Sequence, residues 1–136
     1  MVGILILSHG SLAKELLASA RVISGDLPEF EALTLDWHDS VDDAKRKLSA
    51  LLPGLDRGDG VLILTDMYGS TPSNVALGFR QAGKVEVVAG VNLPMVVRLG
   101  CLTSKVMPLS EMASWIRDKG RSSICGCRSS NGEGET

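Results

Sequence analysis

The sequence predicts an α/β protein: a doubly wound, mainly parallel sheet of four strands with helices on both faces. Two observations favour this fold class. Short apolar runs alternate four times with segments whose apolar residues recur every three or four positions, as strands and crossover helices do in a parallel sheet. Aromatic residues make up only 4% of the chain, so its core must consist of aliphatic side chains, which is common in such sheets.

The first half of the chain contains two strand–helix pairs. The expected elements are a strand over 2–8, a helix over 12–24, a strand over 30–37 and a helix over 41–52. Ser11 and Ser40 precede the two helical patterns and are expected N-caps, because a serine hydroxyl can accept a hydrogen bond from a free N–H of the first turn. Gly25 ends the first helical pattern, and Pro53 with Gly54 ends the second.

The second half repeats the pattern twice and adds a last helix. The expected elements are a strand over 60–66, a helix from Thr71 to about Gln81, a strand over 85–90, a helix opened by residues 91–95 and a helix over 109–119. Thr71 is expected to cap its helix, with Pro72 at the first helical position. Gly83 follows this helix and is expected to stop it.

The composition changes after residue 120. Residues 1–120 are therefore expected to form one domain. The first residues after it, 121–125, are compatible with an additional edge strand. The remainder, up to residue 136, is rich in serine and glycine and is expected to be a disordered tail.

Composition also excludes several classes of function. The net charge is −2 with no long basic run, which argues against nucleic acid as a partner. No signal-peptide pattern opens the chain and no apolar run is long enough to cross a bilayer, so a soluble cytoplasmic protein is expected. The nucleotide-binding patterns GxxxxGK[ST] and GxGxxG and the hydrolase pattern GxSxG do not occur, and no cofactor is expected.

The three cysteines are Cys101, Cys125 and Cys127. An odd number, with two crowded near the C-terminus, is not typical of a disulfide framework. Cys125 and Cys127 could bind a metal or respond to oxidation, but the further ligands of a zinc site do not accompany them. Free thiols and no metal site are therefore expected.

Two strands end in residues that can do chemistry. His9 follows the first apolar run and Asp66 ends the third. If these strands are neighbours, both side chains emerge at the carboxyl edge of the sheet, where α/β proteins bind ligands. A carboxylate that accepts the N–H of one imidazole nitrogen fixes the tautomer and leaves the other nitrogen with a free lone pair. His9 is then a nucleophile. The alternative is that both are ordinary loop residues.

The neighbours of His9 favour the first interpretation. Gly10 leaves room above the ring, and the hydroxyls of Ser11, Ser70 and Thr71 supply hydrogen-bond donors. The two helices that begin near these residues present free N–H groups to the same edge, where anions bind. A nucleophile among anion-binding groups is what phosphoryl transfer requires. His38, the other histidine, is expected to be a solvated residue at a strand end.

Three blocks of sequence carry a resemblance to a known family. They are ILILSHG (4–10), GVLILTDMYGSTP (60–72) and VAGVNLPM (88–95). The chain resembles the IIA domain of the mannose class (mannose/fructose) of the sugar phosphotransferase system, abbreviated PTS, over roughly residues 2–120. The resemblance implies that His9 accepts a phosphoryl group from phospho-HPr on its outer ring nitrogen and passes it to a IIB component.

The resemblance also implies roles for other residues. Asp66 would orient the His9 ring. The family's Gly-Gly-Ser-Pro is here Gly69-Ser70-Thr71-Pro72, so Thr71 keeps the phosphate-binding hydroxyl while Ser70 adds a side chain. A homodimer is implied, often formed in the family by exchange of a C-terminal edge strand, for which residues 121–125 are the candidate. Residues implied to surround the site and contact partner proteins are Met67, Tyr68, Asn92, Leu93, Pro94 and Met95.

Four functions fit these residues. The first is a phosphohistidine carrier for sugar uptake and phosphorylation, which is a phosphotransferase component whose IIB domain is expected on a separate chain. The second is a regulatory module whose phosphorylation at His9 controls partner binding, because a phosphoryl group changes the charge of an interface. The third is a phosphocarrier for dihydroxyacetone phosphorylation, which fits residues 88–95 less well. The fourth is a small-anion binder in which His9 has no role.

Overall fold

The computed structural model describes residues 1–102 and 107–127. Four strands form a single sheet in the order β2-β1-β3-β4, and every pair of neighbours is parallel. The strands are β1 (Gly3–His9), β2 (Phe30–Leu35), β3 (Val61–Thr65) and β4 (Val85–Ala89). The predicted four-stranded parallel sheet is confirmed.

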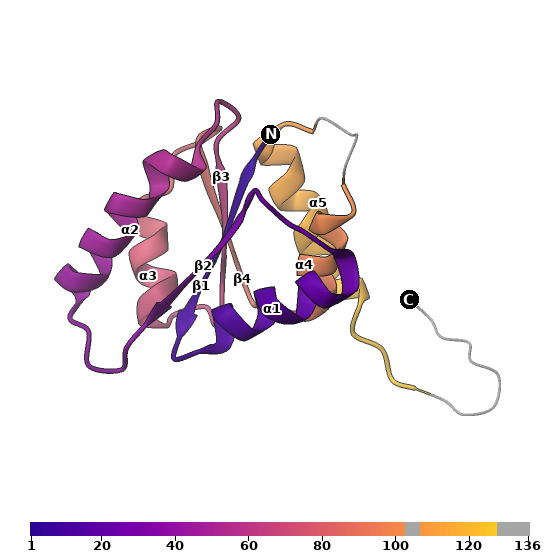
Figure 1. Cartoon of the computed structure of the whole chain (residues 1–136), viewed down its shortest axis with the longest axis horizontal. Helices are drawn as coiled ribbons and strands as arrows, with labels where there is room; N and C mark the ends of the chain where they lie inside the picture. The colour runs from indigo at the N-terminus through magenta and orange to yellow at the C-terminus, as the bar shows by residue number, and fades with distance from the viewer. Residues whose placement is uncertain (103–106, 128–136) are drawn as a thin grey trace.

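Helices cover both faces of this sheet. The helices are α1 (Leu12–Ser24), α2 (Val41–Leu55), α3 (Thr71–Gly78), α4 (Leu93–Gly100) and α5 (Leu109–Ser122). α1, α4 and α5 lie on one face, and α2 and α3 lie on the other (Figure 1). This is the doubly wound arrangement that the alternation of apolar patterns predicts.

The core consists of one mainly aliphatic layer on each side of the sheet. Successive residues of a strand point to opposite faces, so Ile6 packs toward α1 and Leu5 packs toward α2. Leu5, Ile6, Leu62 and Ile63 are all 0% exposed. β1 and β3 are therefore buried on both faces, which explains why their sequences are uninterrupted apolar runs.

Helix α2 continues through the predicted stop at Pro53 and ends at Leu55. A proline this close to the end of a helix removes only one N–H from the last turn. The buried side chain of Leu55 anchors that turn to the core, and its carbonyl oxygen lies against Gly3, where a Cβ would clash. Packing therefore outweighs the breaking signal of Pro53 and Gly54.

The start of α3 differs from the prediction by one residue. Ser70, rather than Thr71, is the N-cap, and its Oγ accepts a hydrogen bond of 3.3 Å from the N–H of Ser73. Thr71 and Pro72 are the first two helical residues, and the helix ends at Gly78 rather than near Gln81.

Ser11 is the N-cap of α1, as predicted, but its hydroxyl makes no capping hydrogen bond. The hydroxyl of the buried Ser8 instead accepts a bond of 2.7 Å from the N–H of Ala13. Ser11 is thus exposed, and its hydroxyl caps no N–H of the helix.

The C-terminal part of the described chain contains no strand. α5 runs through Ser122, and residues 123–127 are irregular, so the additional edge strand expected over 121–125 is not formed within this chain. Asn92 donates to the carbonyl of Gly120 and to Oγ of Ser123, which holds the end of α5 in place. The tail beyond residue 127 lies outside the described residues.

Thr65 is 0% exposed. Its buried hydroxyl has no hydrogen-bond partner among the described residues. An unsatisfied buried polar group costs about 1–3 kcal/mol. We expect Thr65→Val, which keeps the shape and removes the hydroxyl, to raise the free energy of unfolding by about 1 kcal/mol in urea titrations. Thr34→Val on β2 is the control for the added methyl group. A lower stability for Thr65→Val would show that the hydroxyl has a partner in solution.

Candidate active site

The candidate site lies where β1 and β3 end side by side. In the sheet order β2-β1-β3-β4, the chain leaves β1 toward one edge of the sheet and leaves β3 toward the other. The register pairs Leu7 with Thr65, so His9 at the end of β1 and Asp66 just after β3 reach the same place. Open α/β sheets bind ligands at such a reversal of strand order, and the neighbouring strands assumed from the sequence are confirmed.

The His9 ring faces the Asp66 carboxylate. Nδ1 of His9 lies 3.3 Å from Oδ2 of Asp66, and the backbone N–H of His9 donates to the same oxygen at 3.0 Å. The two side chains are 23% and 13% exposed. When Nδ1 carries the ring proton, it donates to Asp66, and Nε2 keeps a lone pair on the opposite edge of the ring.

Asp66 is held by further hydrogen bonds. Its Oδ1 accepts from the N–H of Met67 at 2.7 Å and from the hydroxyl of Ser70 at 3.0 Å. Burial of the carboxyl raises its pKa, but the N–H groups of His9 and Met67, the Ser70 hydroxyl and the nearby imidazole together lower it more. The pKa of Asp66 therefore lies below its usual value, and the group is an ionised acceptor at neutral pH.

The four residues predicted to bind phosphate differ in what they can offer. Ser70 is buried and donates its hydroxyl hydrogen to Asp66, so in this arrangement it supports the carboxylate rather than an anion. The N–H of Gly10 donates to the carbonyl of Leu35 at 3.0 Å. Ser11 is exposed and Thr71 is partly exposed, and both begin helices at this edge. Ser11 and Thr71 are the hydroxyls best placed for an anion.

The residues predicted to contact partner proteins differ in their exposure to solvent. Met67 and Tyr68 are 65% and 80% exposed, and Pro94 is exposed as well. Met95 is 2% exposed and packs against Gly120, so the prediction that it lies on a partner surface is wrong. Its side chain belongs to the core cluster on the side of the sheet that α1, α4 and α5 cover.

Asn92 and Leu93 have structural roles at the start of α4. Oδ1 of Asn92 accepts from the N–H of Met95 at 3.0 Å, which makes Asn92 the N-cap of α4. Leu93 is partly buried against the core. Helix initiation thus explains much of the pattern of residues 91–95, of which Pro94 is the one classed as exposed.

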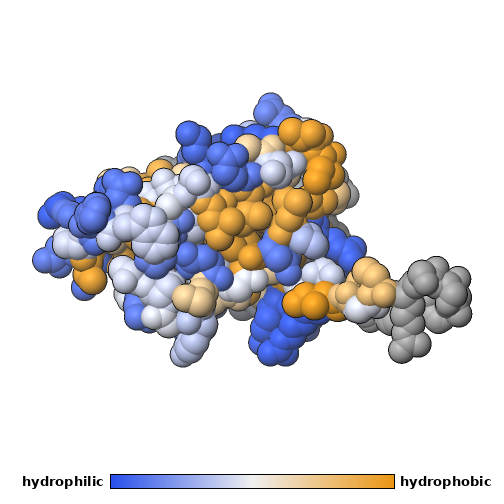
Figure 2. Space-filling model, turned by 90° about the horizontal axis from the view of Figure 1, so that it is seen from below, coloured by the Kyte–Doolittle hydropathy of each residue, from blue (hydrophilic) through white to orange (hydrophobic). Residues whose placement is uncertain are grey.

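Figure 2 views the edge of the sheet at which β1 and β2 end in Figure 1. Apolar side chains gather from the middle of this face to its upper right, with hydrophilic ones mainly on the left. The loops and helix starts that follow strand ends contribute exposed apolar residues: Leu12, Trp37, Met67 and Tyr68. A surface of this kind is suited to contact with another protein.

Trp37 was not singled out by the sequence. Its indole stacks on the His9 imidazole, with ring centroids 4.5 Å apart and planes only 4° from parallel. The strand expected over 30–37 includes Trp37, but β2 ends at Leu35, so Trp37 lies on the loop that follows, beside His38. His38 itself is exposed, as predicted.

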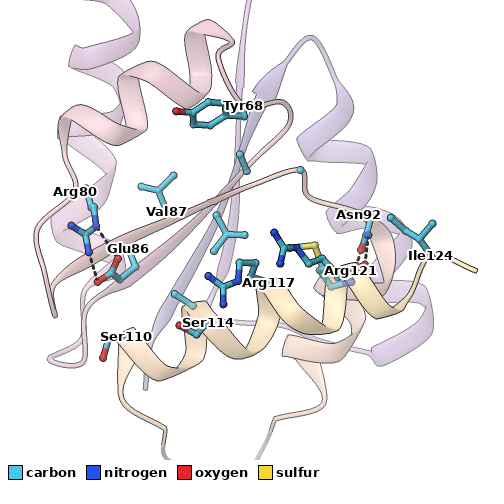
Figure 3. Close-up of a pocket in the computed structure, with 16 residues that line it drawn as sticks. Tyr68, Arg80, Glu86, Val87, Asn92, Ser110, Ser114, Arg117, Arg121 and Ile124 are labelled. Carbon is cyan, nitrogen blue, oxygen red and sulfur yellow. Dashed lines mark hydrogen bonds and ion pairs between the residues drawn. The ribbon is translucent and has the colours of Figure 1, made fainter. Parts of the chain in front are cut away.

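A separate pocket of about 590 Å³ lies between β4 and α5 (Figure 3). Its lining includes Tyr68 and Asn92 but neither His9 nor Asp66. At one end Arg80 pairs with the buried Glu86, with 3.0 Å between Nε and Oε1 (Figure 3). The pocket is therefore distinct from the pair at the ends of β1 and β3.

Neither a metal-binding cluster nor a membrane-spanning helix occurs in the described part of the chain. Residues 1–102 and 107–127 contain no group of three or more His, Cys, Asp or Glu side chains arranged to hold a metal ion. Cys101, Cys125 and Cys127 are exposed free thiols. None of the described helices has the length and apolarity needed to span a bilayer.

Components of the phosphotransferase system are among the known proteins with similar sequences. The family model described as "PTS system fructose IIA component" matches residues 3–114. The mannose-specific EIIAB component of Escherichia coli K12 is 33% identical over 97 residues, which are 71% of this chain and 30% of that protein. The fructose-specific EIIA component of Bacillus subtilis 168 is 27% identical over 100 residues, covering 73% of this chain and 68% of that protein.

Solved structures show the same fold. The mannose/sorbose-specific IIA subunit from Enterococcus faecalis has a TM-score of 0.81 and 30% identity, covering 93% of this chain and 95% of that one. The IIA protein associated with the fucose utilization operon of Streptococcus pneumoniae has a TM-score of 0.80 and 28% identity, covering 93% and 96%. The matching family model, the similar sequences and the shared fold together show that the chain belongs to the mannose/fructose family of PTS IIA components.

Proposed function

We propose that this protein is a phosphohistidine carrier of the PTS. His9 accepts a phosphoryl group from phospho-HPr and passes it to a IIB component, for sugar uptake and phosphorylation. The observation that carries the proposal is the contact between Nδ1 of His9 and the ionised carboxylate of Asp66. Membership of a phosphotransferase-system family supports the same role.

The transfer step uses the lone pair on Nε2 of His9. Nε2 attacks the phosphorus of the donor phosphohistidine, so a P–N bond to His9 forms while the donor's P–N bond breaks and its electron pair returns to the donor ring. The proton on Nδ1 stays between His9 and Asp66, whose negative charge stabilises the positive charge that develops on the imidazole. Passing the group to IIB is the same displacement in reverse, with the acceptor on IIB as nucleophile.

The surface around the site fits a protein donor and a protein acceptor. Both must bring their reacting atom to Nε2, and the exposed Met67, Tyr68 and Pro94 are the partner contacts that we retain. Ser11 and Thr71 are the hydroxyls that we assign to the phosphoryl oxygens. The protein is expected to work in the cytoplasm, peripheral to the membrane only through the permease complex, and as a homodimer.

Phosphoryl transfer from phosphoenolpyruvate through enzyme I and HPr tests the proposal. We expect the chain to acquire one phosphoryl group that is labile in acid and stable in base, as phosphohistidine is, and to lose it when a mannose-class IIB component is added. A chain that stays unlabelled while HPr is charged would contradict the carrier function. A labelled chain that no mannose-class IIB component discharges would instead favour the regulatory module.

A further inference from the structure

The imidazole of His9 is held on two sides, and the proposed mechanism uses only one of them. Asp66 faces the Nδ1 edge of the ring, whereas the indole of Trp37 covers one face, 4.5 Å between centroids and 4° from parallel. Trp37 is 74% exposed. Burial in the core therefore does not explain its position, and its stacking on His9 is the contact that calls for an explanation.

The pairing of β1 with β2 brings Trp37 to the site. The register places His9 beside Leu35, and the N–H of Gly10 donates to the carbonyl of Leu35. Trp37 follows two residues later and crosses over Gly10: a Cβ built on that glycine would lie 3.6 Å from the indole Nε1. The space above Gly10, expected from the sequence to accommodate a bulky group, is thus faced by an aromatic ring.

The loop that carries Trp37 is held at its base. The N–H of Asp36 donates to Oδ2 of Asp39, and the N–H of Asp39 donates to the carbonyl of Asp36, both at 3.0 Å. Lys47 of α2 lies 2.7 Å from the same carboxylate oxygen of Asp39. This turn ties the loop to α2 and fixes the backbone on both sides of Trp37.

A stacked indole restricts how the imidazole can turn. Rotation of His9 about its Cβ–Cγ bond would swing an edge of the ring out of its plane and into the indole. With Nδ1 facing Asp66, blocked rotation keeps Nε2 pointed away from the carboxylate, toward an incoming phosphoryl group. The indole face is also electron-rich, so it attracts the positive charge that the imidazole acquires during transfer.

We propose that Trp37 is a positioning residue of phosphoryl transfer, whose indole holds the plane of the His9 ring while Asp66 holds its Nδ1 edge. This inference rests on the carrier function proposed above. Trp37 lies on the loop after β2. The strand ends at His9 and Asp66, from which the site was predicted, gave this loop no part in the reaction. Because Trp37 acts through His9, its removal should slow the transfer step more than it weakens donor binding.

The test compares Trp37→Ala and Trp37→Phe in the full chain, with Val22→Ala as a control that also removes an exposed apolar side chain, 87% exposed on α1. We expect Trp37→Ala to lower the rate constant at saturating phospho-HPr by roughly three- to tenfold, the range to which energies of aromatic stacking correspond. The half-saturating donor concentration should change little. Trp37→Phe should restore most of the rate, and Val22→Ala should match the wild type.

A spectroscopic measurement gives an independent readout. In a Trp115→Phe background Trp37 is the only tryptophan, because the chain has two. We expect its emission to change on phosphorylation, since the electronic state of the stacked imidazole changes, and to stay constant when His9 is replaced by alanine. Emission that is unaffected by phosphorylation of the Trp115→Phe protein would overturn the stacking.

The outcomes separate this inference from the function on which it rests. A wild-type chain that accepts no phosphoryl group overturns both. A labelled wild type with Trp37→Ala at the wild-type rate, or with Phe as slow as Ala, overturns the positioning role alone. A change confined to the half-saturating donor concentration would also overturn it, because Trp37 would then be a contact of the donor protein.

Discussion

His9→Ala is expected to abolish acceptance of the phosphoryl group, whereas His38→Ala is expected to leave its rate within about twofold, as for most surface changes. The chain has two histidines, and His9 is the one whose ring contacts a carboxylate at the strand ends. His38 lies exposed on the loop between β2 and α2. Without the His9 imidazole the site loses the nucleophilic ring nitrogen that forms the P–N bond.

The measurement is acid-labile phosphate incorporated from phospho-HPr, followed over time for both variants and the wild type. Circular dichroism and the unfolding midpoint show that each variant is folded. Equal loss in the two variants would contradict the assignment of His9, because a loss that does not depend on position would reflect damage to the fold. Label retained in His9→Ala would move the phosphorylated residue elsewhere.

The location of this site could be predicted because it depends on periodicity and topology. An apolar run that is buried on both faces and then stops at a polar residue indicates the carboxyl end of a parallel strand. Two such ends, at His9 and Asp66, come together only if β1 and β3 are neighbours. The prediction assumes that these two strands are neighbours, as in many doubly wound sheets, and the pairing of Leu7 with Thr65 confirms this.

The details that could not be predicted depend on contacts between distant segments. Ser70 rather than Thr71 caps α3 because its hydroxyl can at once accept from the N–H of Ser73 and donate to Asp66. Met95 is in the core because α4 packs against α5 at Gly120, a contact that an eight-residue pattern does not reveal. Trp37 reaches His9 through the pairing of β1 with β2, so no local pattern marks it.

Replacing Asp66 is expected to have the second-largest effect on transfer. We expect Asp66→Ala to slow phosphorylation of His9 by on the order of a hundredfold, the effect of misplacing a reacting group by about an ångström. Without the carboxylate, Nδ1 loses the acceptor that fixes the tautomer and the direction of Nε2. Asp118→Ala, which removes an exposed acid from α5, is the matched control and should transfer at the wild-type rate.

The same substitution should also lower stability, and the structure gives the reason. Asp66 accepts hydrogen bonds from the N–H groups of His9 and Met67 and from the hydroxyl of Ser70, so its loss leaves these donors without their acceptor. The cost is about 1–3 kcal/mol, which a domain of this size tolerates. Transfer rates should therefore be compared well below the unfolding temperature of the variant.

The pH dependence of stability separates the structural role of Asp66 from its role in transfer. Its pKa is lower in the folded protein than in the unfolded chain, where a carboxyl of this type titrates near 3.9. Its stabilising effect is therefore complete above about pH 4 to 5 and is lost as the pH falls through the folded-state pKa. Asp66→Asn should be less stable than the wild type at neutral pH and approach it in acid.

Asp66→Asn also tests the tautomer argument directly, because the amide keeps the size of the carboxyl and loses its charge. When its oxygen keeps accepting from Met67 and Ser70, its NH₂ group takes the place of Oδ2, and the N–H of His9 loses its acceptor. The NH₂ group then donates to Nδ1 and stabilises the tautomer whose proton is on Nε2, where phosphorylation must occur. We therefore expect Asn to be nearly as slow as Ala in transfer while being the more stable variant. Transfer by Asp66→Asn at the rate of Asp118→Ala would remove the carboxylate from the mechanism and leave Trp37 as the group that orients His9.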